Sequence, residues 1–127
     1  MKNIYSNILT FNKKSLTKTI NLLNKQNVVG LPTETVYGVG GSAYSKNSIG
    51  KIFKLKQRNK SNPLIIHYYD INDAVDDVFY NKNFLKLYKK FCPGPVTFIL
   101  KKKINSKIHP LSSAKLSTVA VRFPKHK

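Results

Sequence analysis

Acidic residues, arginine, cysteine and tryptophan are all scarce in this 127-residue sequence. Five Asp and Glu residues stand against 23 Lys and Arg residues, which gives a formal net charge of +18, and tryptophan is absent. The single cysteine, Cys92, excludes an intramolecular disulfide and cannot build a metal cluster alone. No apolar run approaches the roughly 20 residues of a membrane helix, and the short apolar group Ile8-Leu9 does not make a signal peptide. These absences predict a cytoplasmic protein that makes no membrane contact.

Lysine supplies almost all of the positive charge, so the two arginines, Arg58 and Arg122, and the only glutamate, Glu34, stand out. A basic surface attracts polyanions, and an RNA partner is one interpretation of the charge. The other interpretation is a genome with biased nucleotide composition, which would enrich Lys together with Asn, Ile and Tyr. The sequence leaves both interpretations open. Arginine differs from lysine in offering a planar fork that binds phosphate or carboxylate with two hydrogen bonds. The arginines are therefore candidate anion-binding residues, with chance placement as the alternative.

The hydrophobic pattern alternates between helical and strand periodicity. With 41% hydrophobic residues, the chain can bury the core of one domain over residues 1–127. The pattern predicts a helix from an N-cap at Ser15 to Asn27, a second over residues 45–56 and a third that starts at Asn83. Strands are predicted at 28–31, 64–68, 96–100 and 118–121, with loops at 32–41 and 101–117. This alternation indicates an α/β domain whose sheet is covered on both faces.

Four aspartates follow the strand predicted at 64–68, namely Asp70, Asp73, Asp76 and Asp77. A cap at Asp70 or Asn72 would begin a short helix there. Acidic side chains near a helix start are favoured by the helix dipole. We therefore predict a surface helix at these aspartates rather than a metal site.

Familiar catalytic patterns are missing from the sequence. His67, His109 and His126 lack metal-ligand spacing, no serine lies in a nucleophile elbow, and Gly50-Lys51 lacks the P-loop pattern. What remains is a glycine-rich stretch after the first strand, two cations at 56–58 and an arginine ending the last strand. Backbone N–H groups in such stretches and side chains at strand ends suit anionic ligands. The alternative is that the glycines only turn the chain and the cations only solvate a surface.

Four ordered segments resemble the signature of the YrdC family: VVGLPTETVYGVG at 28–40, KQR at 56–58 with NPL at 62–64, CPGPVTF at 92–98 and VAVRFP at 119–124. The resemblance implies an α/β fold with a YrdC-like twisted mixed sheet, flanked by helices around an open basic cavity. It also implies a threonylcarbamoyl-AMP synthase, a nucleotidyltransferase that uses L-threonine, bicarbonate and ATP. Its product, threonylcarbamoyl-AMP, serves the threonylcarbamoyladenosine modification of tRNA beside the anticodon.

The resemblance further implies site residues. Threonine is expected to contact Thr35, His67 and Arg122, of which Arg122 would hold its carboxylate. ATP, carrying Mg²⁺, is expected to contact Lys56, Arg58, Asn62 and Thr118. The first two of these would be the catalytic cations that offset charge on the α-phosphate and the departing pyrophosphate. No residue is assigned to a protein-bound metal. Without the resemblance, His67 reads as a core histidine, Thr35 as a loop cap and Asn62 as a turn former.

Members of the family continue beyond the VAVRFP segment with another strand and a Ser-Ala-Asn segment that completes the nucleotide site. We therefore expect the domain at 1–127 to be incomplete at its C-terminus. Expected partners are tRNA-modification transferase proteins and tRNA. The alternative function is a non-catalytic double-stranded RNA- or tRNA-binding module, which the charge favours. A carbamoyl-transfer domain of a larger maturation enzyme is a third interpretation.

Overall fold

The computed structural model describes residues 7–125, so the expectation for His126 lies outside the described residues. Within this range the order of elements is α1 (Lys13–Asn24), β1 (Val29–Leu31), β2 (Gly38–Gly40), α2 (Lys46–Leu55), β3 (Ile65–His67), α3 (Lys82–Phe91), β4 (Thr97–Lys101), the 3₁₀ helix η1 (Pro110–Ser113) and β5 (Thr118–Arg122). The predicted α/β class is confirmed. None of the helices in this range has both the length and the apolar character needed to cross a bilayer.

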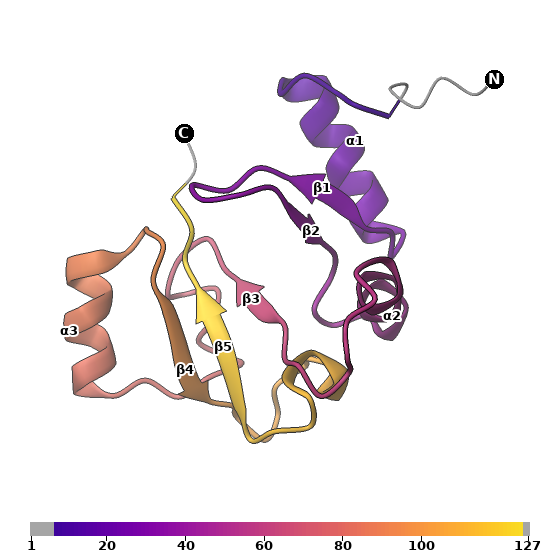
Figure 1. The fold of residues 1–127 in the computed structure, drawn as a ribbon. Coiled ribbons are helices and arrows are strands. Elements are labelled where there is room, and N and C mark those ends of the chain that lie inside the picture. The colour runs from indigo at the N-terminus through magenta and orange to yellow at the C-terminus, as the bar shows by residue number, and fades with distance from the viewer. Residues whose placement is uncertain (1–6, 126–127) are drawn as a thin grey trace.

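The strands of the described part form two sheets, whereas the alternating pattern predicts a single one. β1 and β2 make an antiparallel hairpin, and the second sheet has the order β3-β5-β4. β5 runs parallel to β3 and antiparallel to β4, so this sheet is mixed, as predicted. Figure 1 shows the hairpin beside α1 and α2, with α3 lying next to β4 at the opposite side of the fold. Pro32 follows β1 directly. A proline has no N–H group to donate to a strand ladder, so the pairing of β1 with β2 ends at Leu31.

Two helices start earlier than predicted because asparagines cap them. The Asn12 side chain accepts a hydrogen bond from the Ser15 N–H, and the Ser15 hydroxyl oxygen accepts one from the Asn12 N–H, each at 2.9 Å. Ser15 is therefore the third residue of a reciprocal capping box and not the N-cap itself. α1 also ends at Asn24, before its predicted end. In the same way, Asn81 caps α3, which begins at Lys82.

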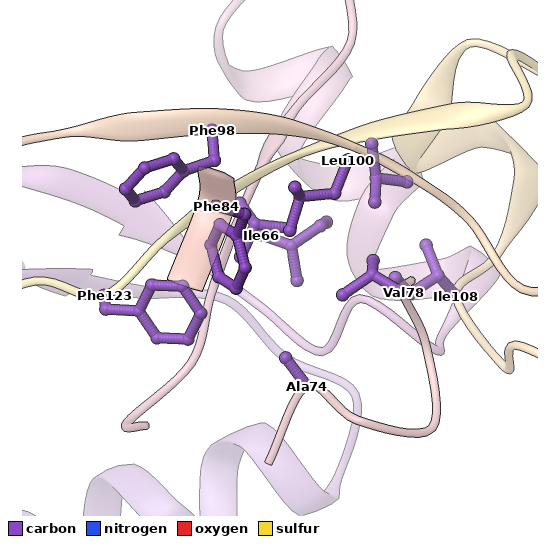
Figure 2. Packing of buried hydrophobic residues seen from close by; sticks show 10 residues of the cluster. Ile66, Ala74, Val78, Phe84, Phe98, Leu100, Ile108 and Phe123 are labelled. Atoms are coloured by element: carbon purple, nitrogen blue, oxygen red, sulfur yellow. The ribbon is translucent and has the colours of Figure 1, made fainter. Parts of the chain in front are cut away.

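The hydrophobic core lies where α3 packs on the mixed sheet. Val119, Val121 and the adjacent Phe123 are all almost completely buried. The Phe84 ring of α3 meets the Phe98 ring of β4 edge-on, with centroids 5.1 Å apart. Figure 2 shows Phe84, Phe98 and Phe123 gathered on one side of the cluster. Burial alternates along β5, so the residues between these apolar ones face away from the core.

Two segments that were predicted to be solvated are partly buried. The aspartate segment forms turns instead of a helix, and Asp77 is only 3% exposed. The carboxylate of Asp77 accepts hydrogen bonds from the hydroxyl groups of Tyr44, Tyr68 and Ser106, which compensate for its burial. The predicted loop at 101–117 contains the end of β4, η1 and the buried Ile108. Long-range hydrogen bonds and core contacts therefore override the local polarity of both segments.

Truncation of Phe123 should cost much of the stability of the fold. Phe123→Ala removes a fully buried ring that packs against Tyr88 at a centroid separation of 4.9 Å, and we expect a loss of about 3–5 kcal/mol in the free energy of unfolding. Phe79→Ala is the matched control, because Phe79 is 50% exposed. Urea unfolding, followed by circular dichroism, measures the free energy of unfolding of both variants and of the wild type. Equal losses for the two variants would contradict this account of the core.

Candidate functional site

A cavity of about 1090 Å³ lies between the β1–β2 hairpin, α2 and the β3 side of the mixed sheet. Its wall includes the glycines of β2, the N-terminal end of α2 and the segment that follows α2. β3 contributes all of its residues, and β5 contributes Arg122. Segments that are distant in the sequence therefore enclose one space.

Most of the residues that the resemblance assigns to substrates line this cavity, namely Thr35, Lys56, Arg58, His67 and Arg122. Asn62 and Thr118 are not among the lining residues. The Asn62 backbone carbonyl lies close by and accepts a hydrogen bond from Arg58 Nε at 3.2 Å. Thr118 begins β5, at the end of the strand opposite Arg122. The proposed ATP contacts of Asn62 and Thr118 stay predictions.

Gly41, at the end of the glycine-rich stretch, lets the backbone pack closely against the side chains of Val28 and of α2. No glycine in residues 7–125 has a positive φ, so unusual backbone angles do not explain these glycines. A Cβ on Gly41 would instead lie 3.0 Å from Ser48 Cβ and 3.2 Å from Val28 Cγ1. Ser45, which caps α2, and Lys46 line the cavity close to this contact. A helix N-terminus with a lysine beside it favours an anionic group in this part of the cavity.

Arg58 is held in place by backbone carbonyl groups. Gln57 adopts a left-handed conformation with φ of 48°, which turns the chain after α2. Arg58 Nη2 then donates to the Pro63 carbonyl at 2.9 Å, and Nε donates to the Asn62 carbonyl. Two hydrogen bonds on one edge of the guanidinium fix its orientation at the wall of the cavity.

Arg122 and His67 are direct partners in the parallel pairing of β3 with β5. Burial and then the positive charge of Arg122 lower the pKa of His67 below its usual value, so the imidazole is neutral at pH 7. The Arg122 side chain is only 12% exposed. Its Nε and Nη2 atoms are buried; Nε has no hydrogen-bond partner among the described residues, and Nη2 has only an ion-pair contact with a carboxylate. These two atoms form the edge of the fork that can bind a carboxylate bidentately.

Glu34 lies next to this arginine edge. Its Oε1 atom is 3.1 Å from Arg122 Nη2 and also accepts a hydrogen bond from the Lys125 N–H at 3.3 Å. The tip of the β1–β2 hairpin lies beside the segment that follows β5 (Figure 1). Burial opposes ionisation of Glu34, but backbone N–H groups of Glu34 and Lys125, together with Arg122, lower its pKa. The rarity of glutamate in this chain was the only sequence signal for this contact.

Tyr44 and Tyr68 also line the cavity and were missed by the sequence-based predictions. Tyrosine is common in this chain, so its abundance gives no signal. Residues 7–125 contain no group of three or more His, Cys, Asp or Glu side chains arranged to hold a metal ion. The lining therefore combines cations, a neutral histidine and hydroxyl groups.

Comparison with known sequences identifies relatives over most of the chain. A model of the Sua5/YciO/YrdC family, described as "Telomere recombination", matches residues 21–127. The chain is 39% identical over 119 residues to the threonylcarbamoyl-AMP synthase of Bacillus subtilis, a match that covers 93% of this chain and 34% of that protein. It is also 39% identical over 103 residues to the threonylcarbamoyl-AMP synthase of Pyrococcus abyssi, covering 78% and 29% of the two chains. The chain thus spans about a third of the length of these relatives.

Solved structures agree with this relationship. Pyrococcus abyssi Sua5 complexed with L-threonine matches with a TM-score of 0.84 and 32% identity, over 93% of this chain and 34% of that one. Escherichia coli YciO matches with a TM-score of 0.77 at 21% identity, over 91% of this chain and 56% of that one. The second likeness concerns the fold alone.

Removal of the Glu34 charge should lower stability in a pH-dependent way. The pKa of Glu34 is lowered on folding, so its contribution is present above the unfolded-state value of 4.5 and is lost as the pH falls through the folded-state value. Glu34→Gln should therefore melt at a lower temperature than the wild type at pH 7, and the difference should shrink towards about pH 3. Thermal scans across this range, with Asp76→Asn as an exposed control, measure the effect. A difference that is independent of pH would contradict it.

Proposed function

Because the chain belongs to the Sua5/YciO/YrdC family, we propose that it contributes the substrate cavity of a threonylcarbamoyl-AMP synthase. In this reaction, L-threonine, bicarbonate-derived carbon dioxide and ATP give threonylcarbamoyl-AMP and pyrophosphate. The observation that carries the proposal is the buried edge of Arg122 at the cavity, where Nε has no partner among the described residues and Nη2 contacts only the carboxylate of Glu34. This edge suits the carboxylate of a free amino acid, and the relative from Pyrococcus abyssi was solved with L-threonine.

Threonine binding would involve an exchange of carboxylates. Glu34 lies within ion-pair distance of Arg122 Nη2, so an incoming amino-acid carboxylate would take this position and align with both Nε and Nη2. His67 would then lie beside the amine, because it pairs directly with Arg122 across the two strands. A neutral imidazole adds no second positive charge next to the threonine ammonium group. Thr35, on the hairpin loop, would contact the rest of the amino acid.

The ATP phosphates would occupy the part of the cavity lined by Lys56, Arg58 and the start of α2, with Mg²⁺ arriving bound to ATP. The threonine ammonium group loses one proton, the resulting amine nitrogen bonds to carbon dioxide, and loss of a second proton from nitrogen gives a carbamate. A carbamate oxygen attacks the α-phosphorus, and the bond to the bridging oxygen of pyrophosphate breaks. Lys56 and Arg58 would stabilise the charge that gathers on the phosphates, so they are the proposed catalytic residues.

The product would pass to proteins that transfer the threonylcarbamoyl group to tRNA, in the cytoplasm. A non-catalytic RNA-binding module is the second candidate, and the observation that favours it is the charge on α3. This helix carries four lysines, Lys82, Lys86, Lys89 and Lys90, and no acidic residue. Threonine binding, measured by calorimetry, separates the two candidates, because an RNA-binding module needs no amino-acid pocket.

Arginine geometry should matter more than charge in the cavity. Arg122→Lys keeps the charge but removes the bidentate edge, and we expect threonine affinity to fall by more than about tenfold. Arg58→Lys should likewise weaken ATP binding, because Nε and Nη2 orient the group. Lys101→Ala, in the exposed part of β4, is the control. Isothermal calorimetry measures all three. Normal affinities in both arginine variants, with a loss in the lysine variant, would favour a general basic surface instead.

Threonine should bind more tightly than serine. Burial of the additional methyl group is worth about 1 kcal/mol, which corresponds to a preference of about fivefold. Competition calorimetry with the two amino acids tests this preference on one protein sample, without any variant. Equal affinities would contradict the assignment of Thr35, His67 and Arg122 to a threonine pocket.

A further inference from the structure

We infer that Tyr44 and Tyr68 form a second recognition subsite in the cavity, one that binds a hydrogen-bond-donating group of the ligand, because Asp77 behind them takes both phenolic protons. The subsite would recognise a hydroxyl, amino or ammonium group and would disfavour phosphate or carboxylate. The inference rests on the proposed function where it names ATP and threonine as the ligands. The arrangement of the three side chains is independent of that function.

The geometry of the cluster fixes the direction of its hydrogen bonds. The hydroxyl groups of Tyr44 and Tyr68 each lie 2.7 Å from Asp77 Oδ2. Ser106 Oγ lies 2.6 Å from the other carboxylate oxygen, Oδ1. An ionised carboxylate has no proton to donate, so each of the three hydroxyl groups must be the donor. A buried anion with three such donors is compensated, although no cation pairs with it among these contacts.

The protonation states agree with this direction. Burial would raise the pKa of Asp77, but the hydrogen bonds from Ser106, Tyr68 and Tyr44 outweigh it and lower the pKa. Burial, followed by the hydrogen bond to Asp77, raises the pKa of Tyr44 to about 12, and the same causes raise the pKa of Tyr68. Around neutral pH the carboxyl group is therefore ionised and both phenols keep their protons.

Two of the three side chains line the cavity, and this determines which hydrogen-bonding groups a ligand would meet there. Tyr44 and Tyr68 are lining residues, whereas Asp77 is not. Each phenol has one proton, which is committed to Asp77, and its remaining capacity is that of an acceptor. A hydrogen-bond donor on the ligand would complete it, whereas an anionic oxygen would not. Oxygen atoms of phosphate or carboxylate are acceptors, so they belong at Lys56, Arg58 and Arg122.

The cavity thus has two regions of opposite hydrogen-bonding character. One offers donors to anions, and the other offers two neutral acceptors held by a buried carboxylate. ATP carries suitable donors in its ribose hydroxyl groups and its adenine amino group. Threonine carries them in its hydroxyl and ammonium groups. Both sources share one chemistry, and ligand analogues distinguish them.

The experiment pairs variants of the protein with analogues of the ligand. Calorimetry measures the affinity of the wild type, Tyr44→Phe and Tyr68→Phe for ATP, 2′-deoxy-ATP, 3′-deoxy-ATP and inosine triphosphate. The same proteins are titrated with threonine, 2-aminobutyrate and 3-hydroxybutyrate. We expect each Phe variant to lose about three- to tenfold in affinity for one parent ligand. The loss should disappear with the analogue that lacks the recognised group, because the two deletions then remove the same contact.

Controls separate recognition from folding. Tyr69→Phe is matched in chemistry and adjacent in sequence, but Tyr69 is 89% exposed and does not line the cavity. It should bind every ligand like the wild type. Pyrophosphate affinity should also be unchanged in Tyr44→Phe and Tyr68→Phe, because the anion binds in the other region. Thermal scans verify that each variant is folded.

The possible outcomes are distinct. Equal losses for every ligand, pyrophosphate included, would mean that the cluster is only structural and would overturn the subsite. Unchanged affinity of both Phe variants for all ligands would overturn it as well. Wild-type protein that binds neither ATP nor threonine would refute the proposed function and the subsite together. Normal wild-type binding without coupling to any analogue would refute the subsite alone.

Discussion

The alternation of side chains along β5 is the constraint on which both the core and the cavity depend. β5 is the central strand of the mixed sheet and pairs with β3 on one side and β4 on the other. Val119 and Val121 face the core, while Arg122 lies at the cavity. A shift of the pairing by one residue would bury the guanidinium and expose the valine. The packing that stabilises the sheet therefore also positions the Arg122 side chain at the cavity.

Local patterns predict the elements of this fold well and their partners poorly. Periodicity identifies α2, because Ile49, Ile52 and Phe53 recur on one buried face. Periodicity cannot say which strands pair, so it does not separate the β1–β2 hairpin from the mixed sheet. Nor does it locate helix starts, since Asn12 caps α1 from outside the apolar repeat. Tertiary pairing and side-chain capping supply information that the apolar repeat does not contain.

The candidate site shows the same division. Thr35 and Arg122 belong to short motifs whose order along the chain is informative, His67 lies three residues after another of them, and the structure brings all three residues to one cavity. The Tyr44–Asp77 contact joins residues 33 positions apart and has no motif. Asp77 was predicted to lie on the surface because its neighbours in the sequence are acidic, and the hydroxyl groups that stabilise it come from elsewhere in the chain. Such contacts become visible only when the chain is folded.

The contact at Gly41 has a mechanical consequence for the cavity. A Cβ atom at Gly41 would lie 3.0 Å from Ser48 Cβ. The chain after β2 and the helix α2 are therefore already in close contact at this point. α2 is a ten-residue helix, and its two flanking caps, Ser45 and Lys56, both line the cavity. A helix moves as a stiff rod, so a displacement at Ser48 shifts both ends. A side chain at Gly41 would therefore press on α2 at Ser48, and a shift of the helix would move Ser45 and Lys56 together.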